Sequence, residues 1–309
     1  MKDNTDSWEK LGRIIAPDKG IWWLNTHVGA SCAVHLKESK FQLYITGRDE
    51  ENRSHIGRAT IDLEDIHKSI QLESEPCFSP GLPGTFDENG VSYPSIIKQN
   101  NDLFMFYVGW MPTVLRPFQN NIGLAKLSKT EKTFKRVSRA PILTLTNDEP
   151  IGSGSCSVLF EEGIWKMWYT AWLKWGNNKN EHKHYYLIRY STSKDGKYWE
   201  RNYLNCIQFL NNDEYAIGKP SVVKLNETYH MWFVYRGKQY KIGYAHSDDG
   251  LHWQRNDKLA GISLSQEGWE SESISYPYVF LNESHLYMLY CGNNYGEGGL
   301  GIAKLRYYE

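Results

Sequence analysis

The sequence predicts an all-β protein, a five-bladed β-propeller whose ring is closed by its N-terminal strand. Three observations support this prediction. A pattern of 17 residues occurs five times at nearly constant spacing, a third short β-type run follows each copy, and no stretch shows a sustained helical period. Four short strands per unit and a fixed period of about 60 residues are typical of propeller blades.

The repeated pattern is a strand of small and apolar residues, a short turn, and a second strand rich in aromatic residues. No copy needs a gap, and the last residues of successive copies lie 62, 62, 64 and 57 positions apart. Short runs of this composition, bounded by turns, indicate strands. The copies are SCAVHLKESKFQLYITG (31–47), YPSIIKQNNDLFMFYVG (93–109), SCSVLFEEGIWKMWYTA (155–171), KPSVVKLNETYHMWFVY (219–235) and YPYVFLNESHLYMLYCG (276–292).

Two further strands complete most units. The third strand carries a small residue where neighbouring backbones approach closely, and it lies at 56–59, 122–125, 188–191, 242–245 and 300–303. A fourth strand follows in three units, at 133–143, 198–207 and 252–262. In two of these an Asp-Gly pair supplies the tight turn before the strand.

The fifth unit ends after three strands, and its missing strand is found at the other end of the chain. Residues 7–15 read SWEKLGRII, which resembles the fourth strands that begin YWER and HWQR. We therefore expect the N-terminus to complete blade five, which would hide two sheet edges. The prediction is one propeller domain over residues 1–309. A β-sandwich is the structural alternative, but it does not predict a fixed period of this length.

Composition excludes several classes of protein. The chain has 35 Lys and Arg against 36 Asp and Glu, a balance that argues against a nucleic-acid partner or a polybasic membrane surface. No apolar run approaches the roughly 18 residues of a membrane span. The N-terminus lacks a signal-peptide core, and the five Cys show no CxxC spacing. We expect a cytoplasmic protein with reduced thiols, no metal and no cofactor.

Aligned repeats identify the positions that face the central channel. In a propeller, the loops that lead into the first strands and the loops that leave the second strands open onto one face. The first strands begin at Ser31, Tyr93, Ser155, Lys219 and Tyr276. Six residues earlier, the lead-in loops carry Asn25, Asp87, Glu149, Asp213 and Glu270. The second strands are followed by Arg48, Trp110, Trp172, Arg236 and Asn293.

These residue types suit the binding of a sugar, because aromatic rings stack on sugar rings and polar side chains bond to hydroxyls. Cleavage of a glycosidic bond needs a pair of carboxylates, and the candidates are Glu272, Asp87, Glu214 and Glu270. The candidate substrate-binding residues are His27, Arg48, Asp49, Tyr93, Trp110, Trp172, Lys219, Arg236, Tyr276 and Asn293. The competing interpretation is structural: acids in such loops also form turns at strand ends, and Trp110 and Trp172 are also suited to the core.

Three motifs resemble the superfamily of five-bladed glycosidase propellers. They are DENGVSYPS followed by FMFYVGW (87–95 and 104–110), WESE followed by YP (269–272 and 276–277), and GNNYG (292–296). The superfamily includes glycoside hydrolase family 43, the invertases and levansucrases, and the mannoside phosphorylases. The resemblance covers essentially the whole chain and implies a sugar bound in the central channel.

The catalytic residues of these relatives have no counterparts here. The family 43 positions correspond to Ser31, Tyr93 and Ser155, none of which is a carboxylate. The Asn-Asp-Pro nucleophile of the invertases is also missing, since residues 24–29 read LNTHVG. Either a different carboxylate set acts, or the protein does not hydrolyse glycosides.

The first hypothesis is therefore a glycoside-active enzyme, and the alternatives are a phosphorylase or transferase that uses an activated sugar, or a non-catalytic carbohydrate-binding propeller. Lys219, Arg48, Arg236 and His27 would place positive charge at the channel mouth, which favours an acidic or phosphorylated sugar. Alternatively, these cations pair with neighbouring loop acids. The expected partner is a small carbohydrate, with no nucleic acid and no membrane.

Overall fold

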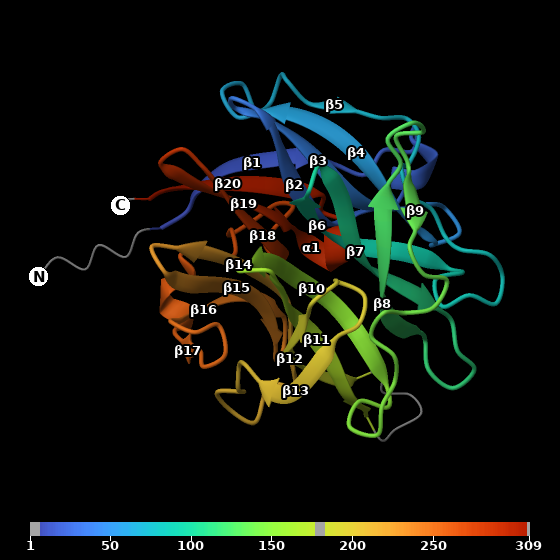
Figure 1. Ribbon diagram of the computed structural model, residues 1–309. Helices are drawn as coiled ribbons and strands as arrows, with labels where there is room; N and C mark the ends of the chain where they lie inside the picture. The colour runs from blue at the N-terminus through green and yellow to red at the C-terminus, as the bar shows by residue number, and fades with distance from the viewer. Residues whose placement is uncertain (1–6, 177–182, 308–309) are drawn as a thin grey trace, which may run out of the picture.

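The computed structural model describes residues 7–176 and 183–307. Its strands form five blades, each a set of four antiparallel strands (Figure 1). Single parallel bridges, Ser54 to Gly90 and Tyr186 to Ala216, join blades one and two and blades three and four into two larger sheets. Blade one consists of β2 (His27–Lys37), β3 (Lys40–Arg48), β4 (Ser54–Asp62) and β5 (Gln71–Leu72). Blade two consists of β6 (Gly90–Gln99), β7 (Asp102–Met111), β8 (Gln119–Leu127) and β9 (Phe134–Arg136), and blade three of β10 (Gly152–Glu161), β11 (Ile164–Trp175), β12 (His184–Ser193) and β13 (Glu200–Asn205). Blade four consists of β14 (Ala216–Leu225), β15 (Thr228–Arg236), β16 (Tyr240–Ser247) and β17 (Gln254–Arg255), and blade five of β18 (Ser275–Asn282), β19 (His285–Cys291), β20 (Leu300–Arg306) and β1 (Glu9–Ile15). The only helical elements in the described chain are single turns: Trp22–Leu24, Asp257–Ala260 and α1 (Asn293–Gly296).

The five sheets form the predicted propeller. The innermost strands β2, β6, β10, β14 and β18 each adjoin the next, and β18 adjoins β2, so they surround a central channel. The predicted closure of blade five is confirmed, because β1 pairs antiparallel with β20. Trp8 fixes this strand: its indole nitrogen donates to the Ala260 carbonyl oxygen at 3.0 Å, and its ring meets Trp232 edge-on.

The hydrophobic core lies between the blades. Five clusters of buried side chains each join two adjacent sheets, with blade one against blade two, and so on around to blade five against blade one. The small residue of the third strand has a packing reason. Gly57 and Gly301 lie directly beneath the rings of Trp23 and Trp269, where a Cβ atom would collide with the indole. The aromatic richness of the repeat is therefore used mainly for packing between sheets.

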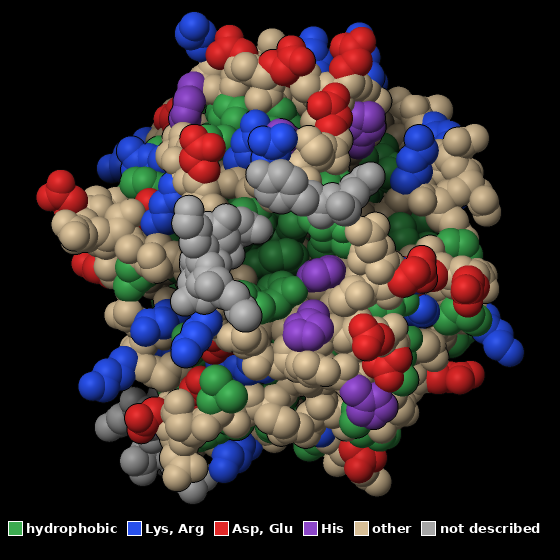
Figure 2. All heavy atoms as spheres, turned by 90° about the vertical axis from the view of Figure 1, so that its left-hand side faces the viewer, with side chains coloured by type: hydrophobic (Ala, Val, Ile, Leu, Met, Phe, Trp, Pro, Cys, Tyr) green, Lys and Arg blue, Asp and Glu red, His purple; other side chains and the backbone are tan. Residues whose placement is uncertain are grey.

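The outer surface is mixed in charge. On the face shown in Figure 2, acidic and basic side chains are interspersed, in keeping with the formal charge of −1. Among the described residues, no helix has the length and apolar character needed to cross a lipid bilayer.

Candidate functional site

Four acids of the lead-in loops lie inside the blades, whereas Asp213 is exposed. Asp87 is fully buried, and its carboxylate accepts hydrogen bonds from the Arg136 guanidinium at 2.7 Å and from the Tyr107 hydroxyl at 2.9 Å. Arg136 belongs to the fourth strand of the same blade. Arg136 therefore neutralises the charge of Asp87, a predicted catalytic acid, within the same blade.

The same arrangement recurs in the next three blades. Each buried acid is paired with a basic residue of the fourth strand: Glu149 with Arg201 at 2.8 Å, Glu214 with Arg255 at 2.7 Å, and Glu270 with Lys10 at 3.2 Å. These ion pairs tie the outer strand of each blade to the loop at its inner end. The geometry favours the structural role that was the competing interpretation of these acids.

Two bulged inner strands turn tyrosines toward the channel. Tyr93 and Tyr276 have left-handed backbones, with φ of 52° and 58°, and each precedes a proline. The strand register shifts at both points. Lys219 occupies the equivalent position in β14 with φ of 48°. Non-glycine residues rarely adopt this conformation, and such strain is typical of functional sites.

Bulges also explain where the inner strands begin. These strands start between one and four residues earlier than the sequence predicted, for example at Gly90 rather than Tyr93. The extra residue interrupts the alternation of side chains, so the first residues of each strand carry no strand pattern.

A cavity of about 660 Å³ occupies the channel mouth, and we call it the main cavity. This volume lies within the usual range for small-molecule sites. Its aromatic lining includes Tyr93, Tyr186, Tyr215, Tyr240, Tyr276, Tyr295, Trp172 and Phe118. Its basic lining consists of Arg48, Lys183, His184, Lys219 and Arg236. No Asp or Glu of the described chain lines it.

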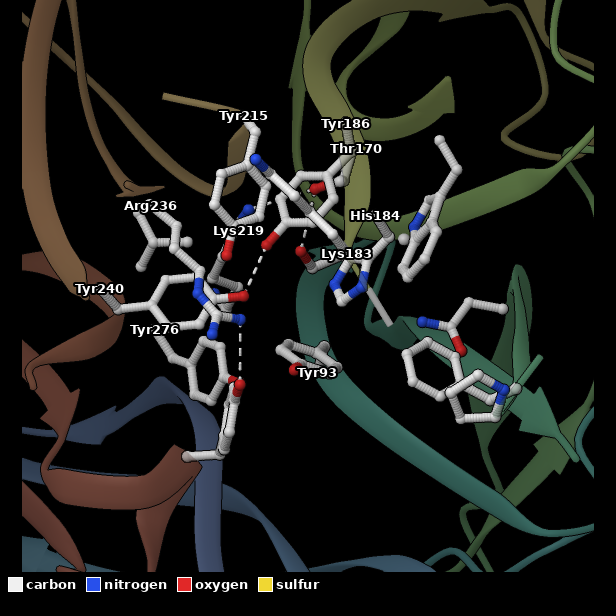
Figure 3. Close-up of a pocket in the computed structure, with 18 of the residues that line it drawn as sticks. Tyr93, Thr170, Lys183, His184, Tyr186, Tyr215, Lys219, Arg236, Tyr240 and Tyr276 are labelled. Atoms are coloured by element: carbon white, nitrogen blue, oxygen red, sulfur yellow. Dashed lines mark hydrogen bonds between the residues drawn. The ribbon is translucent and has the colours of Figure 1, made fainter. Parts of the chain in front are cut away.

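Three phenol hydroxyls and the Arg236 guanidinium lie together in one cluster of the main cavity (Figure 3). The hydroxyls of Tyr186 and Tyr240 lie 2.7 Å apart. The Arg236 guanidinium covers the Tyr240 ring at 4.9 Å and donates to the Tyr295 hydroxyl at 3.1 Å. Burial raises the pKa of both Tyr186 and Tyr240, so these phenols stay neutral near pH 7. One hydroxyl donates to the other, which leaves the second hydroxyl's proton for a ligand.

Lys219 is the most unusual group in the lining. It is 4% exposed, and its ammonium donates to the carbonyl oxygen of Pro277 at 3.3 Å. Burial lowers the pKa of Lys219 to about 8. None of the ion pairs found among the described residues includes it.

A second cavity of about 280 Å³ adjoins the main cavity, and we call it the side cavity. The two share Arg48, Tyr93 and Tyr276. The side cavity is further lined by His27 and by Trp110, whose indole nitrogen donates to the Ser54 hydroxyl at 2.7 Å. Burial and the nearby Arg48 lower the pKa of His27 to about 4. His27 is therefore uncharged at neutral pH, which leaves Arg48 as the cation of the side cavity.

The structure brings together most of the predicted binding residues. The main cavity contains Arg48, Tyr93, Trp172, Lys219, Arg236 and Tyr276, and the side cavity adds His27 and Trp110. Asp49 and Asn293 line neither cavity. Asp49 is buried beside Arg53 and His55, and the Asn293 side chain accepts the backbone N–H groups of Glu272 and Ser273.

None of the four predicted catalytic acids lines either cavity. Asp87, Glu214 and Glu270 are buried in ion pairs, while Glu272 is exposed. Their catalytic role stays a prediction, and the geometry of the three buried acids does not favour it.

Sequence reasoning missed several lining residues, but a signal for them exists. Ser54, Asn120, Tyr186 and Tyr240 all stand two positions before the first apolar residue of the third-strand pattern. The start of the third strand therefore faces the channel as well in blades one to four. Phe118, Lys183, His184, Tyr215 and Tyr295 lie in or beside loops that have no common register, so no repeat pattern marks them.

The fold is a five-bladed propeller that is similar to solved structures of glycoside hydrolases. Solved structures with this fold include a glycosyl hydrolase from Bacteroides ovatus, with a TM-score of 0.72 and 14% identity, covering 97% of this protein and 93% of that one. A thermostable family-43 glycoside hydrolase has a TM-score of 0.67 and 17% identity, covering 92% and 90%. A structure described with the GH130 mannoside phosphorylases has a TM-score of 0.67 and 14% identity, covering 98% and 95%. At these identities the similarity establishes the fold.

Two relatives are much closer in sequence. They are the Mycobacterium tuberculosis proteins named Uncharacterized protein MT1551 and Uncharacterized protein Rv1502. Each is 37% identical over 299 residues, which covers 97% of this chain and 99% of the relative. The chain belongs to the same family as these two mycobacterial proteins. No protein-family model matches the sequence.

Proposed function

We propose that the protein is a glycoside-active enzyme whose substrate is an acidic or phosphorylated sugar bound in the main cavity. One observation carries the proposal: the described lining combines six tyrosines with five basic side chains and contains no carboxylate. The solved structures that share the fold include glycoside hydrolases and a structure described with mannoside phosphorylases. Their presence supports a sugar as the ligand.

The basic groups are suited to an anion in different ways. A guanidinium can bind a carboxylate or phosphate through two parallel hydrogen bonds, and Arg48 and Arg236 are both in the lining. Tyrosine rings offer flat faces for sugar rings and hydroxyls for their oxygens. A neutral sugar would leave the Arg48 and Arg236 guanidinium groups without a counter-ion in the described lining, which is unfavourable.

The cavity constrains the chemistry. Hydrolysis by two carboxylates needs both acids beside the glycosidic bond, and the described lining offers none. Of the four candidate acids only Glu272 is exposed, and it lines neither cavity.

A second candidate function follows from the same observation. An attacking phosphate brings its own nucleophilic oxygen and needs cations to hold it, so a basic, acid-free cavity supports a phosphorylase or transferase. A non-catalytic sugar-binding protein is the third candidate, because the buried acids already serve as ion-pair partners within the blades.

Calorimetric titration with matched ligands tests the proposal. Glucuronate should bind and glucose should bind at least about tenfold more weakly, because only the acid engages the guanidinium groups. Arg236→Lys keeps the charge but loses the two-pronged geometry, so it should weaken glucuronate binding by about tenfold. Equal affinity for both sugars, unchanged by Arg236→Lys, would contradict an anionic ligand.

Product formation then separates the three candidates. A panel of aryl glycosides and aryl glycuronides should be incubated with and without inorganic phosphate. Release of the aryl group without phosphate indicates hydrolysis, and release that requires phosphate indicates a phosphorylase. Binding of glucuronate without any product from the panel favours a sugar-binding protein.

A further inference from the structure

We infer that the ammonium group of Lys219 forms an anion subsite, in which it binds the anionic group of the ligand as its counter-ion. The inference deepens the proposed function and rests on it for the sugar part of the ligand. It places the anion beside the inner strand β14, in the part of the main cavity that Lys219 lines.

The first argument is the contrast between Lys219 and the other buried charges. Asp87, Glu149, Glu214 and Glu270 are each matched by a cation within 3.2 Å. The Lys219 ammonium is just as deeply buried, but its hydrogen bond goes to a neutral carbonyl oxygen. A buried charge without a counter-ion is unfavourable. Because the other buried charges are paired within the protein, the counter-ion of the Lys219 ammonium comes from a ligand.

The second argument is the backbone. Lys219 has a left-handed φ of 48° at a strand bulge, immediately before Pro220. Its backbone N–H donates to the Thr170 hydroxyl on the neighbouring blade at 3.2 Å, which helps hold this conformation. The equivalent residues in blades two and five are the cavity tyrosines Tyr93 and Tyr276. The same local strain therefore presents a side chain to the cavity in three blades.

The third argument is that no anionic group of the described residues lies near Lys219. The titratable groups around it are the thiols of Cys32, Cys156 and Cys291, on β2, β10 and β19. Burial raises the pKa of Cys32 and Cys156 to about 12, and that of Cys291 is raised as well. The tyrosines from β6, β12, β16 and β18 that line the same cavity have raised pKa values too. All of these groups are neutral near pH 7.

The other cations of the cavity complete the subsite. Arg236, on β15 of the same blade, and Arg48, on β3 of blade one, line the cavity with Lys219 (Figure 3 labels Lys219 and Arg236). Phenol hydroxyls from Tyr93 and Tyr276 add neutral donors. A carboxylate, sulfate or phosphate suits this set, because each presents several oxygen acceptors to several donors. The neutral part of the ligand then extends toward the side cavity.

The test compares Lys219→Met with a matched control. Met keeps the length of the side chain without its charge. Lys224→Met removes a lysine from the same strand that is partly exposed and pairs with Glu227 instead of facing the cavity. Inorganic phosphate and glucuronate are titrated into each protein by calorimetry. Lys219→Met should weaken both by at least about tenfold, and Lys224→Met should change neither.

A footprint on the unmodified protein gives a second measurement that does not depend on how a variant folds. Reductive methylation with formaldehyde and borohydride is followed at Lys219 by peptide mass spectrometry. Phosphate and glucuronate should slow methylation of Lys219, and glucose should not. Methylation of Lys224 should be the same in all samples.

The outcomes separate the inference from the proposed function. Unchanged anion affinity in Lys219→Met, or no protection of Lys219 by either anion, overturns the subsite. If anion binding instead depends on Arg48 and Arg236 alone, the anionic ligand survives and the role of Lys219 fails. If phosphate binding depends on Lys219 but no sugar binds, the subsite stands and the proposed function fails.

Discussion

Lys219→Met should stabilise the ligand-free protein at pH 7. Met fills nearly the same volume and leaves no buried charge. Burial lowers the pKa of Lys219 from 10.5 to about 8. At about 1.4 kcal/mol per pKa unit, the charged form then costs the folded state about 3 kcal/mol at pH 7. The expected increase in the free energy of unfolding is of this order of magnitude.

The difference between the two proteins should shrink as the pH rises. The folded protein releases the Lys219 proton near pH 8, whereas the unfolded chain keeps it until about pH 10.5. Between these values the unfolded state binds more protons, so wild-type stability rises relative to the variant by about 1.4 kcal/mol per pH unit. Burial keeps the thiols of Cys32, Cys156 and Cys291 protonated in both folded proteins across this pH range, so their titration cancels in the comparison.

Urea unfolding followed by tryptophan fluorescence measures this difference at a series of pH values. Lys224→Met serves as the control, and its effect should stay within about 0.5 kcal/mol at each pH. If Lys219→Met were less stable than wild type at pH 7, or if its effect did not vary with pH, the ammonium would have a counter-charge in the folded protein. The reasoning about Lys219 would then be wrong.

Three further predictions concern binding and stability. At pH 8, glucuronate should bind with uptake of up to about half a proton by Lys219, and calorimetry in buffers of different ionisation enthalpy should show no uptake in Lys219→Met. Trp8→Ala should lower the free energy of unfolding by about 3–5 kcal/mol, measured in urea, because a buried ring and its bond to Ala260 are lost from the closing strand. Glu149→Gln should destabilise by about 3 kcal/mol, because Arg189 and Arg201 lose their charge partner, yet it should leave glucuronate affinity unchanged. A stable Trp8→Ala variant would contradict the role of that residue in closure, and loss of ligand binding in Glu149→Gln would contradict a purely structural acid.

The channel positions were predictable to the extent that they belong to the repeat. Tyr93, Lys219 and Tyr276 share one register position, and the structure places all three in the main cavity. Tyr186 and Tyr240 share another, at the start of the third strands, and the same reasoning extended to that strand would have identified them. Residues such as Tyr295 lie in a loop particular to one blade, so only the folded chain shows that they reach the channel.

The lead-in acids show the limit of the sequence pattern. Asp87 and Glu149 lie in register at the channel end of their blades, which is also where catalytic acids would lie. Their partners Arg136 and Arg201 stand 49 and 52 residues further along the chain. Nothing in the local sequence of either acid indicates that a cation from the outer strand covers it.

The sequence by itself determined the blade architecture, because strand pairing within a blade is mostly local and the same pattern occurs five times. It also determined the closure, because residues 7–15 resemble the fourth strands of other blades. It also determined which strand faces the channel. Only the tertiary structure decided which charges are free for a ligand, because that depends on which side chains from distant strands meet inside the protein. The buried acids meet cations of the outer strands, whereas Lys219 meets neutral thiols, phenols and a carbonyl oxygen where five inner strands converge. Burial in such surroundings means that the charged Lys219 side chain destabilises the folded protein and can bind an anion as its counter-ion.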